Sequence, residues 1–203
     1  MNKIFYRVLI IAGVVFICTA AALFGYSRME DFIAGRHASG LMGQISLVSE
    51  PADGYDDVTD VTFSSEQVML IPVSYEGMDF NTIGFISVPK IGIMLPVIDR
   101  VNDDLLKISV CWYSGEMSPH PERMILTAHN YRSHFGLIGS LVVGDEVVFR
   151  ANSGVVYGYV VTGLMEIAGD DEVALDSGEW ELTLLTCTRD RVRRVLVRCE
   201  RVF

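Results

Sequence analysis

The fold of this 203-residue chain is decided by two alternating segments near its end, Thr183-Leu184-Leu185-Thr186-Cys187 and Arg194-Val195-Leu196-Val197-Arg198. Each segment has the alternation and residue types of a β-strand, and the six residues between them predict an antiparallel hairpin. In that register Cys187 lies opposite Arg194. Side chains directly opposite each other share a face and lie about 5 Å apart. We therefore expect a thiol and a guanidinium to face the same space.

The same register separates Cys187 from the last cysteine of the chain, Cys199. It puts Cys199 opposite Leu182, five residues along the strand from Cys187, or about 17 Å at ~3.4 Å per residue. A disulfide needs Cα atoms within about 7 Å. Cys18 lies in an apolar N-terminal run and cannot pair within the domain. The remaining cysteines, Cys111, Cys187 and Cys199, are odd in number, so at least one of their thiols stays free. We interpret Cys199 as a core residue and Cys187 as a candidate nucleophile.

A cysteine nucleophile needs a cation nearby and a proton donor. The thiolate attacks a carbonyl, a cation helps to keep it ionised, and a guanidinium stabilises the oxyanion that forms. Histidine is the usual proton donor, and the four candidates are His37, His120, His129 and His134. His129 follows the apolar run 124–128, where a strand reaches the rim of a sheet. The residue pattern alone ranks His129 and His134 equally.

Beyond residue 81 the chain consists of short apolar runs separated by Gly, Asp and Asn. Seven or eight short strands predict an all-β domain, either an antiparallel barrel or a sandwich. Only residues 102–110 have a helical pattern, with Asn102 or Asp103 as the N-cap. The expected strands are 83–88, 93–98, 124–128, 145–150, 155–162, 164–167, 181–187 and 193–201.

The N-terminal sequence predicts a membrane anchor. Lys3 and Arg7 precede an uncharged run, residues 8–27, which spans about 30 Å as a helix and matches the hydrocarbon core of a bilayer. The positive-inside rule places the N-terminus in the cytoplasm and the rest of the chain outside. A signal peptide cleaved at Ala20-Ala21-Ala22 is the rival interpretation, but the run is longer than the usual apolar region of such peptides.

Charge and composition divide the chain into an anchor (1–27), an extracellular linker or cover segment (28–80) and a barrel (81–203). The cover segment is expected to begin with a short amphipathic helix and continue as coil that packs over or beside the groove, with Tyr55 and Phe63 as plugs. The net charge of −10 excludes a nucleic-acid partner, which needs a basic face. No residue spacing indicates a metal site or a cofactor.

These residues, taken together, resemble the sortase family. Residues 183–187 resemble its T-L-x-T-C signature, and residues 126–130 (Leu-Thr-Ala-His-Asn) are similar to its histidine segment, with Ala128 where many members have Gly. Residues 86–92 (Ile-Ser-Val-Pro-Lys-Ile-Gly) resemble its first strand. The resemblance covers about residues 82–203 and the N-terminal anchor. It implies an eight-stranded β-barrel with short helices, preceded by a transmembrane helix.

The resemblance also implies chemistry and partners. Cys187 would be the nucleophile, His129 the acid/base and Arg194 the oxyanion-stabilising cation, although a one-residue slip would replace Arg194 with Arg193. The implied reaction cleaves an L-P-x-T-G-like signal of Gram-positive surface proteins or pilins between Thr and Gly. It forms a thioester, which passes to an amine of a peptidoglycan precursor or a pilin lysine. The alternative is a non-catalytic anchored barrel that binds sorting peptides or assists pilus assembly. An L,D-transpeptidase is disfavoured because Ser133-His134-Phe135-Gly136 lacks a nearby cysteine.

Overall fold

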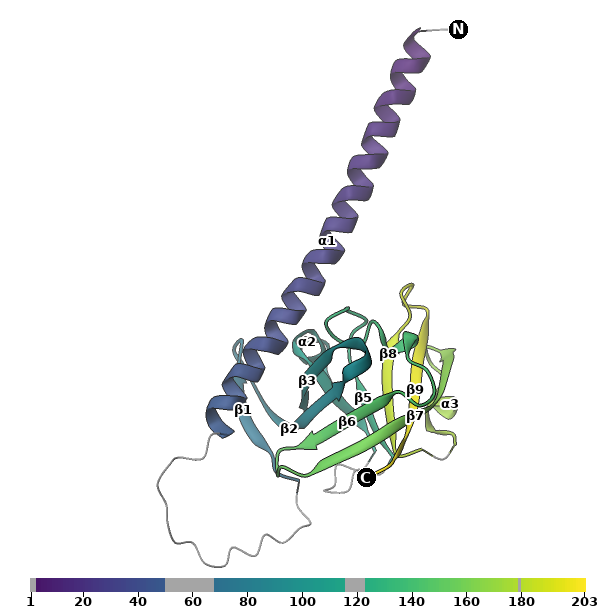
Figure 1. The fold of residues 1–203 in the computed structure, drawn as a ribbon. Helices are drawn as coiled ribbons and strands as arrows, with labels where there is room; N and C mark the ends of the chain where they lie inside the picture. The colour runs from purple at the N-terminus through teal and green to yellow at the C-terminus, as the bar shows by residue number, and fades with distance from the viewer. Residues whose placement is uncertain (1–2, 50–67, 116–122, 179) are drawn as a thin grey trace, which may run out of the picture.

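Eight strands close into a β-barrel in the computed structural model, which describes residues 3–49, 68–115, 123–178 and 180–203 (Figure 1). The neighbours around the barrel are β2-β3-β4-β5-β8-β9-β7-β6, and pairing of β2 with β6 completes the circle. The predicted eight-stranded barrel is confirmed. The strands are β2 (Met78–Val88), β3 (Ile93–Ile98), β4 (Val110–Ser114), β5 (Met124–Thr127), β6 (Glu146–Ala151), β7 (Val156–Ala168), β8 (Leu182–Cys187) and β9 (Arg193–Arg201).

Two of the neighbouring strand pairs, β3–β4 and β5–β8, are parallel, and the others around the barrel are antiparallel. Along β8 successive side chains alternate between the barrel interior and its outer face. Leu182 and Leu184 belong to the interior core, whereas Leu185 packs outside with Leu196 of β9. Odd-numbered residues of β8 therefore face outward, toward the helices that cover the barrel.

Short helices connect several strands. Helix α2 (Asp103–Ile108) links β3 to β4 and begins where the sequence predicts, because the Asn102 side chain accepts a hydrogen bond from the Leu105 backbone at 2.8 Å. Helix α3 (Glu172–Asp176) lies between β7 and β8. Two single 3-10 turns, η1 (Pro89–Ile91) and η2 (Ile138–Ser140), follow β2 and the histidine loop.

The N-terminal segment forms one continuous helix, α1 (Lys3–Ser49), so the expected anchor and the expected short helix are a single element, and residues 28–49 contain no coil. It is the one helix in the described ranges that is long and apolar enough to cross a membrane. Its second half packs on the barrel through a buried stripe of Ala34, Ala38, Leu41 and Ile45. That spacing keeps one helical face against α2, the strand β1 (Ile71–Tyr75), β2 and β3, so the helix continues as it follows the barrel (Figure 1).

Strand β1 (Ile71–Tyr75) lies outside the closed barrel and extends β2 as an antiparallel hairpin. β2 runs across the expected boundary at residue 81, and α1 runs across the expected boundary at residue 27. The secondary structure therefore does not break at either expected domain boundary. The division into 1–27, 28–80 and 81–203 stays a prediction. Tyr55 and Phe63 lie outside the described residues, as does His120.

Candidate active site

The hairpin of β8 and β9 has the register that the sequence predicts. Cys187 pairs with Arg194, and Leu182 pairs with Cys199. The Cys187 side chain is exposed, whereas Cys199 is fully buried, and this burial raises the pKa of its thiol to about 12. Cys111 is also buried, and all four cysteines are free. Cys187 is therefore the accessible thiol of the barrel.

His129 lies two residues beyond the end of β5, and β5 is the strand next to the cysteine strand β8. The parallel β5–β8 ladder ends at Thr127 and Leu185, two residues before His129 and Cys187. A continuation of that register would place His129 level with Cys187 and on the outer face of the barrel, the face of Arg194. Two hydrogen bonds join the neighbours of the histidine to the neighbours of the cysteine: Thr186 Oγ1 to Ala128 O at 2.8 Å, and Asn130 Nδ2 to Thr188 O at 3.0 Å.

The surroundings of His129 favour its neutral form. Burial is the main cause that lowers the pKa of its imidazole, and the guanidinium of Arg191 acts in the same direction. Asp103 raises the pKa by a smaller amount, Lys107 lowers it, and Glu30 raises it slightly. The half-buried ring also packs against Tyr131, with 5.0 Å between ring centroids. The histidine is thus held in place with a reduced tendency to carry a proton.

The structure separates the two histidines that the residue pattern ranked equally. His134 is fully buried, and neither ring nitrogen has a hydrogen-bond partner within the described part of the chain. Burial lowers the pKa of its imidazole to about 4. His37 lies on α1 near Tyr75, far along the chain from the hairpin. Burial makes His134 a packing residue, whereas His129 is the histidine whose sequence neighbours bond to the neighbours of Cys187.

The two arginines of β9 have different surroundings. Arg193 pairs with Ala168 of β7, forms an ion pair with the Glu166 carboxylate at 3.5 Å and donates to the Glu166 carbonyl at 3.1 Å. Arg194 is half-buried and lines a cavity of about 270 Å3 beside α3. Its register partner is Cys187, so the one-residue slip does not occur. The cavity is lined by Tyr113, Ile167, Gly169, Asp170, Asp171, Glu172, Leu175 and Arg194.

A second cavity, of about 540 Å3, is lined by Cys187 itself and shares no lining residue with the Arg194 cavity. It lies between η2, the end of β8 and the β8–β9 loop. No three His, Cys, Asp or Glu side chains are grouped to hold a metal ion in the described ranges. The lining residues are Asn130, Phe135, Gly136, Leu137, Gly139, Ser140, Glu166, Thr186, Cys187, Thr188, Arg189, Asp190, Arg193 and Val195.

Arg198, which the sequence analysis did not single out, fastens α3 to the hairpin. Arg198 as a residue is only 5% exposed, and its guanidinium carbon lies 4.4 Å from the Trp180 ring centroid. Burial lowers its pKa to about 10. It donates to Thr183 Oγ1 at 2.6 Å, Leu175 O at 2.7 Å and Ala174 O at 2.9 Å. One buried cation therefore positions the helix that forms a wall of the Arg194 cavity.

Comparisons with known proteins agree with this geometry. The family model described as "Sortase domain" matches residues 86–202. Sortase C1 from Streptococcus agalactiae is 30% identical, covering 59% of this chain and 67% of that one at a TM-score of 0.52. Sortase C from Clostridium perfringens SM101 is 29% identical, covering 60% and 70% at a TM-score of 0.52.

A structure described as a pilus-related sortase C of Group B Streptococcus is 26% identical, covering 60% of this chain and 68% of that one at a TM-score of 0.54. No curated protein sequence matches the chain. The sortase-domain match nevertheless covers more than half of the 203 residues, including both the histidine strand and the cysteine hairpin. On this ground the chain belongs to the sortase family of cysteine transpeptidases.

Proposed function

We propose that this protein is a membrane-anchored transpeptidase that cleaves an L-P-x-T-G-like sorting signal between Thr and Gly. Cys187 is the nucleophile, His129 the acid/base and Arg194 the cation that supports substrate and oxyanion. The observation that carries the proposal is the register of three neighbouring strands. The β8–β9 register pairs Cys187 with Arg194, and the β5–β8 register runs to Thr127 and Leu185, two residues before His129 and Cys187; both support a site built from these three residues.

The first half of the reaction breaks the peptide bond. The Cys187 thiolate attacks the threonine carbonyl, and the negative charge that develops on its oxygen is stabilised by the Arg194 guanidinium. When the tetrahedral intermediate collapses, the carbon–nitrogen bond breaks and His129 gives a proton to the departing glycine amine. The threonine carbonyl carbon is then joined to the Cys187 sulfur as a thioester.

The second half transfers the threonine acyl group to an amine. The amine attacks the thioester, His129 accepts a proton from the attacking nitrogen, and the Cys187 thiolate leaves. Since the first step needs an ionised Cys187 thiol and a cationic His129 imidazole together, activity should follow a bell-shaped pH profile. The proposed acceptor is an amine of a peptidoglycan precursor or a lysine of a pilin.

The Arg194 cavity is the proposed binding site of the sorting peptide. Tyr113, Ile167 and Leu175 offer apolar contacts there, and Arg194 connects the cavity to the thiol through the hairpin register. A structure described as Clostridium perfringens sortase C with the C-terminal cell wall sorting motif, 27% identical to this chain, supports a peptide of this kind. Surface proteins or pilins that carry such a signal are the proposed partners.

The proposed location is the cell membrane, with a single crossing by the first part of α1. Lys3 and Arg7 flank the uncharged run on one side, so the N-terminus lies in the cytoplasm and the barrel outside. The described side chains between Leu9 and Tyr26 are exposed, as expected for a helix surrounded by lipid. The barrel then reaches substrates at the outer surface of the membrane.

Peptide cleavage by the full chain in detergent micelles tests this function. The protein is incubated with a pool of L-P-x-T-G-like and related peptides plus hydroxylamine, and mass spectrometry detects hydroxamate-capped products. Wild type should form product, Cys187→Ala and His129→Ala should form none, and Arg194→Ala should lose far more activity than Arg193→Ala. If no peptide reacts while iodoacetamide still alkylates Cys187, the non-catalytic peptide-binding barrel replaces the proposal.

A further inference from the structure

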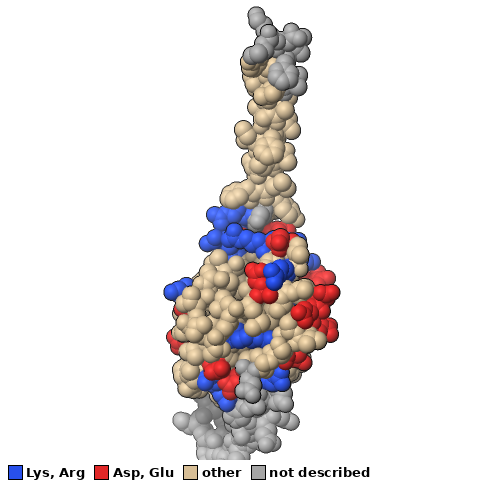
Figure 2. Space-filling view, turned by 90° about the vertical axis from the view of Figure 1, so that its right-hand side faces the viewer, with Lys and Arg blue, Asp and Glu red and all other residues tan. Residues whose placement is uncertain are grey.

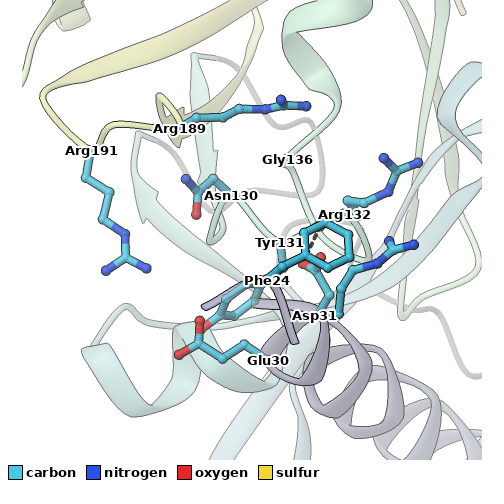
Figure 3. Close-up of a pocket in the computed structure, with 10 residues that line it drawn as sticks. Phe24, Glu30, Asp31, Asn130, Tyr131, Arg132, Gly136, Arg189 and Arg191 are labelled. Atoms are coloured by element: carbon cyan, nitrogen blue, oxygen red, sulfur yellow. Dashed lines mark hydrogen bonds between the residues drawn. The ribbon is translucent and has the colours of Figure 1, made fainter. Parts of the chain in front are cut away.

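A third cavity, of about 480 Å3, separates α1 from the loops that follow His129 and Cys187 (Figure 3). One wall is the part of α1 that immediately follows the uncharged run. The opposite walls are the loop after β5 and the β8–β9 loop. The lining residues are Phe24, Arg28, Glu30, Asp31, Asn130, Tyr131, Arg132, Gly136, Arg189 and Arg191.

The cavity is positively charged although the protein is acidic. Four of its lining residues are arginines and two are acids, whereas the whole chain has a net charge of −10. The Asp31 carboxylate already accepts a hydrogen bond from the Arg132 backbone at 2.9 Å. Among the described residues, none of the four guanidiniums lies within 4.0 Å of a carboxylate oxygen. These cations are therefore available to an external anion.

The cavity also lies where a membrane surface would be. Arg28 is the first charged residue after the uncharged run 8–27, and its guanidinium lies 5.7 Å from the Phe24 ring centroid. Figure 2 shows Lys and Arg side chains gathered directly beneath the apolar part of α1. Phe24 and Tyr131 add aromatic rings to the lining (Figure 3), and aromatic side chains are common at the level of lipid headgroups.

The cationic cavity adjoins the one that contains the candidate nucleophile. Asn130, Gly136 and Arg189 line both cavities. The Asn130 side chain also donates to the Thr188 carbonyl, one residue after Cys187. A group bound in the cationic cavity would consequently lie beside the entrance to the Cys187 cavity.

We propose that the cationic cavity binds the phosphate of an anionic phospholipid headgroup from the outer leaflet of the membrane. This rests on the proposed crossing by α1, but it does not require peptide cleavage. The guanidiniums of Arg28, Arg132 and Arg191 supply the positive charge, since arginine matches phosphate geometry and retains its charge. Binding seats the barrel against the bilayer, with the Cys187 cavity opening beside the headgroup layer.

Native mass spectrometry of the full chain in detergent tests the site, with phosphatidylglycerol and phosphatidylcholine as probes. Wild type should retain phosphatidylglycerol in preference to phosphatidylcholine. The double variant Arg132→Gln/Arg191→Gln should weaken retention by about fivefold per arginine, or about 25-fold in total, on the usual scale for basic residues at an anionic membrane. The matched control Arg100→Gln/Arg150→Gln removes two arginines outside the cavity and should leave retention unchanged.

Three results would overturn the proposal. Wild type could retain both lipids equally, the control pair could lose as much phosphatidylglycerol as the cavity pair, or soluble glycerol phosphate could displace the lipid at equal concentration. Cys187→Ala keeps the two proposals apart, because it should retain the lipid fully. If wild type retains phosphatidylglycerol selectively but cleaves no peptide, the lipid site stands and the proposed reaction fails.

Discussion

Replacing the buried His134 with phenylalanine should protect the fold against acid. The imidazole is fully buried, and burial is the main cause that lowers its pKa to about 4, with His129 and His37 acting in the same direction. The backbone of Ala34 on α1 and Ile108 on α2 opposes this shift without making a hydrogen bond that satisfies either ring nitrogen. Protonation therefore puts a buried charge between two helices and the barrel, which the backbone of Ala34 and Ile108 offsets only in part.

The sign and size of the effect follow from the two pKa values. The unfolded chain binds a proton at His134 near pH ~6.5, whereas the folded chain does so only near pH 4. Stability from the neutral histidine is therefore complete above pH ~6.5, falls as the pH decreases and levels off below pH ~4. The difference of about 2.5 pKa units corresponds to roughly 3 kcal/mol of unfolding free energy.

Urea unfolding of the full chain in micelles, followed by near-ultraviolet circular dichroism, measures this effect. Between pH ~7 and pH ~4, wild type should lose roughly 3 kcal/mol more stability than His134→Phe. The control His37→Gln changes a half-buried histidine on α1, the helix whose Ala34 backbone lies beside His134. This variant should keep most of the stability loss that wild type shows in acid. An identical pH dependence for wild type and His134→Phe would refute the reasoning.

Three further predictions concern the site and its supports. Arg191→Ala should raise the pKa of His129, because the variant removes a positive charge that lowers this pKa. Glu30→Gln should lower the pKa of His129, because it removes a negative charge that raises it. NMR titration of the imidazole measures both changes. Arg198→Met should lower the free energy of unfolding by about 3 kcal/mol. It should also raise the KM for peptide, because α3 is no longer fastened, while the rate of thiol alkylation stays at the wild-type value. An unchanged KM would contradict the role of α3. Leu41→Ala should lower the free energy of unfolding by about 2–5 kcal/mol, because this side chain is fully buried between α1 and the barrel. Thermal unfolding that matches wild type would show that α1 is not docked on the barrel.

The hairpin register and the barrel could be predicted because local patterns determine them. Two alternating runs joined by a six-residue loop allow few pairings, and a one-residue slip would expose apolar side chains. Cys187 therefore meets Arg194 as expected. Helix α2 was predictable for a similar reason, since Asn102 caps it within three residues.

Features that depend on distant segments were not predictable in the same way. The stripe on α1 contains Ala34 and Ala38, whose small side chains give little signal until α2 and the barrel cover them. Arg198 lies at an outward-facing strand position, which reads as solvent-exposed until α3 folds over it. His129 and His134 differ by five residues in sequence, and only the docking of α1 and α2 buries one of them.

The continuity of α1 has a consequence for where the enzyme can act. Asp31 accepts the Arg132 backbone hydrogen bond and is only four residues beyond the uncharged run, or about 6 Å along the helix axis. No hinge interrupts the helix between Lys3 and Ser49. With the membrane crossing proposed above, the helix would fix the distance of the thiol from the bilayer. A substrate would then be selected by how far its scissile bond lies from the membrane as well as by its sequence.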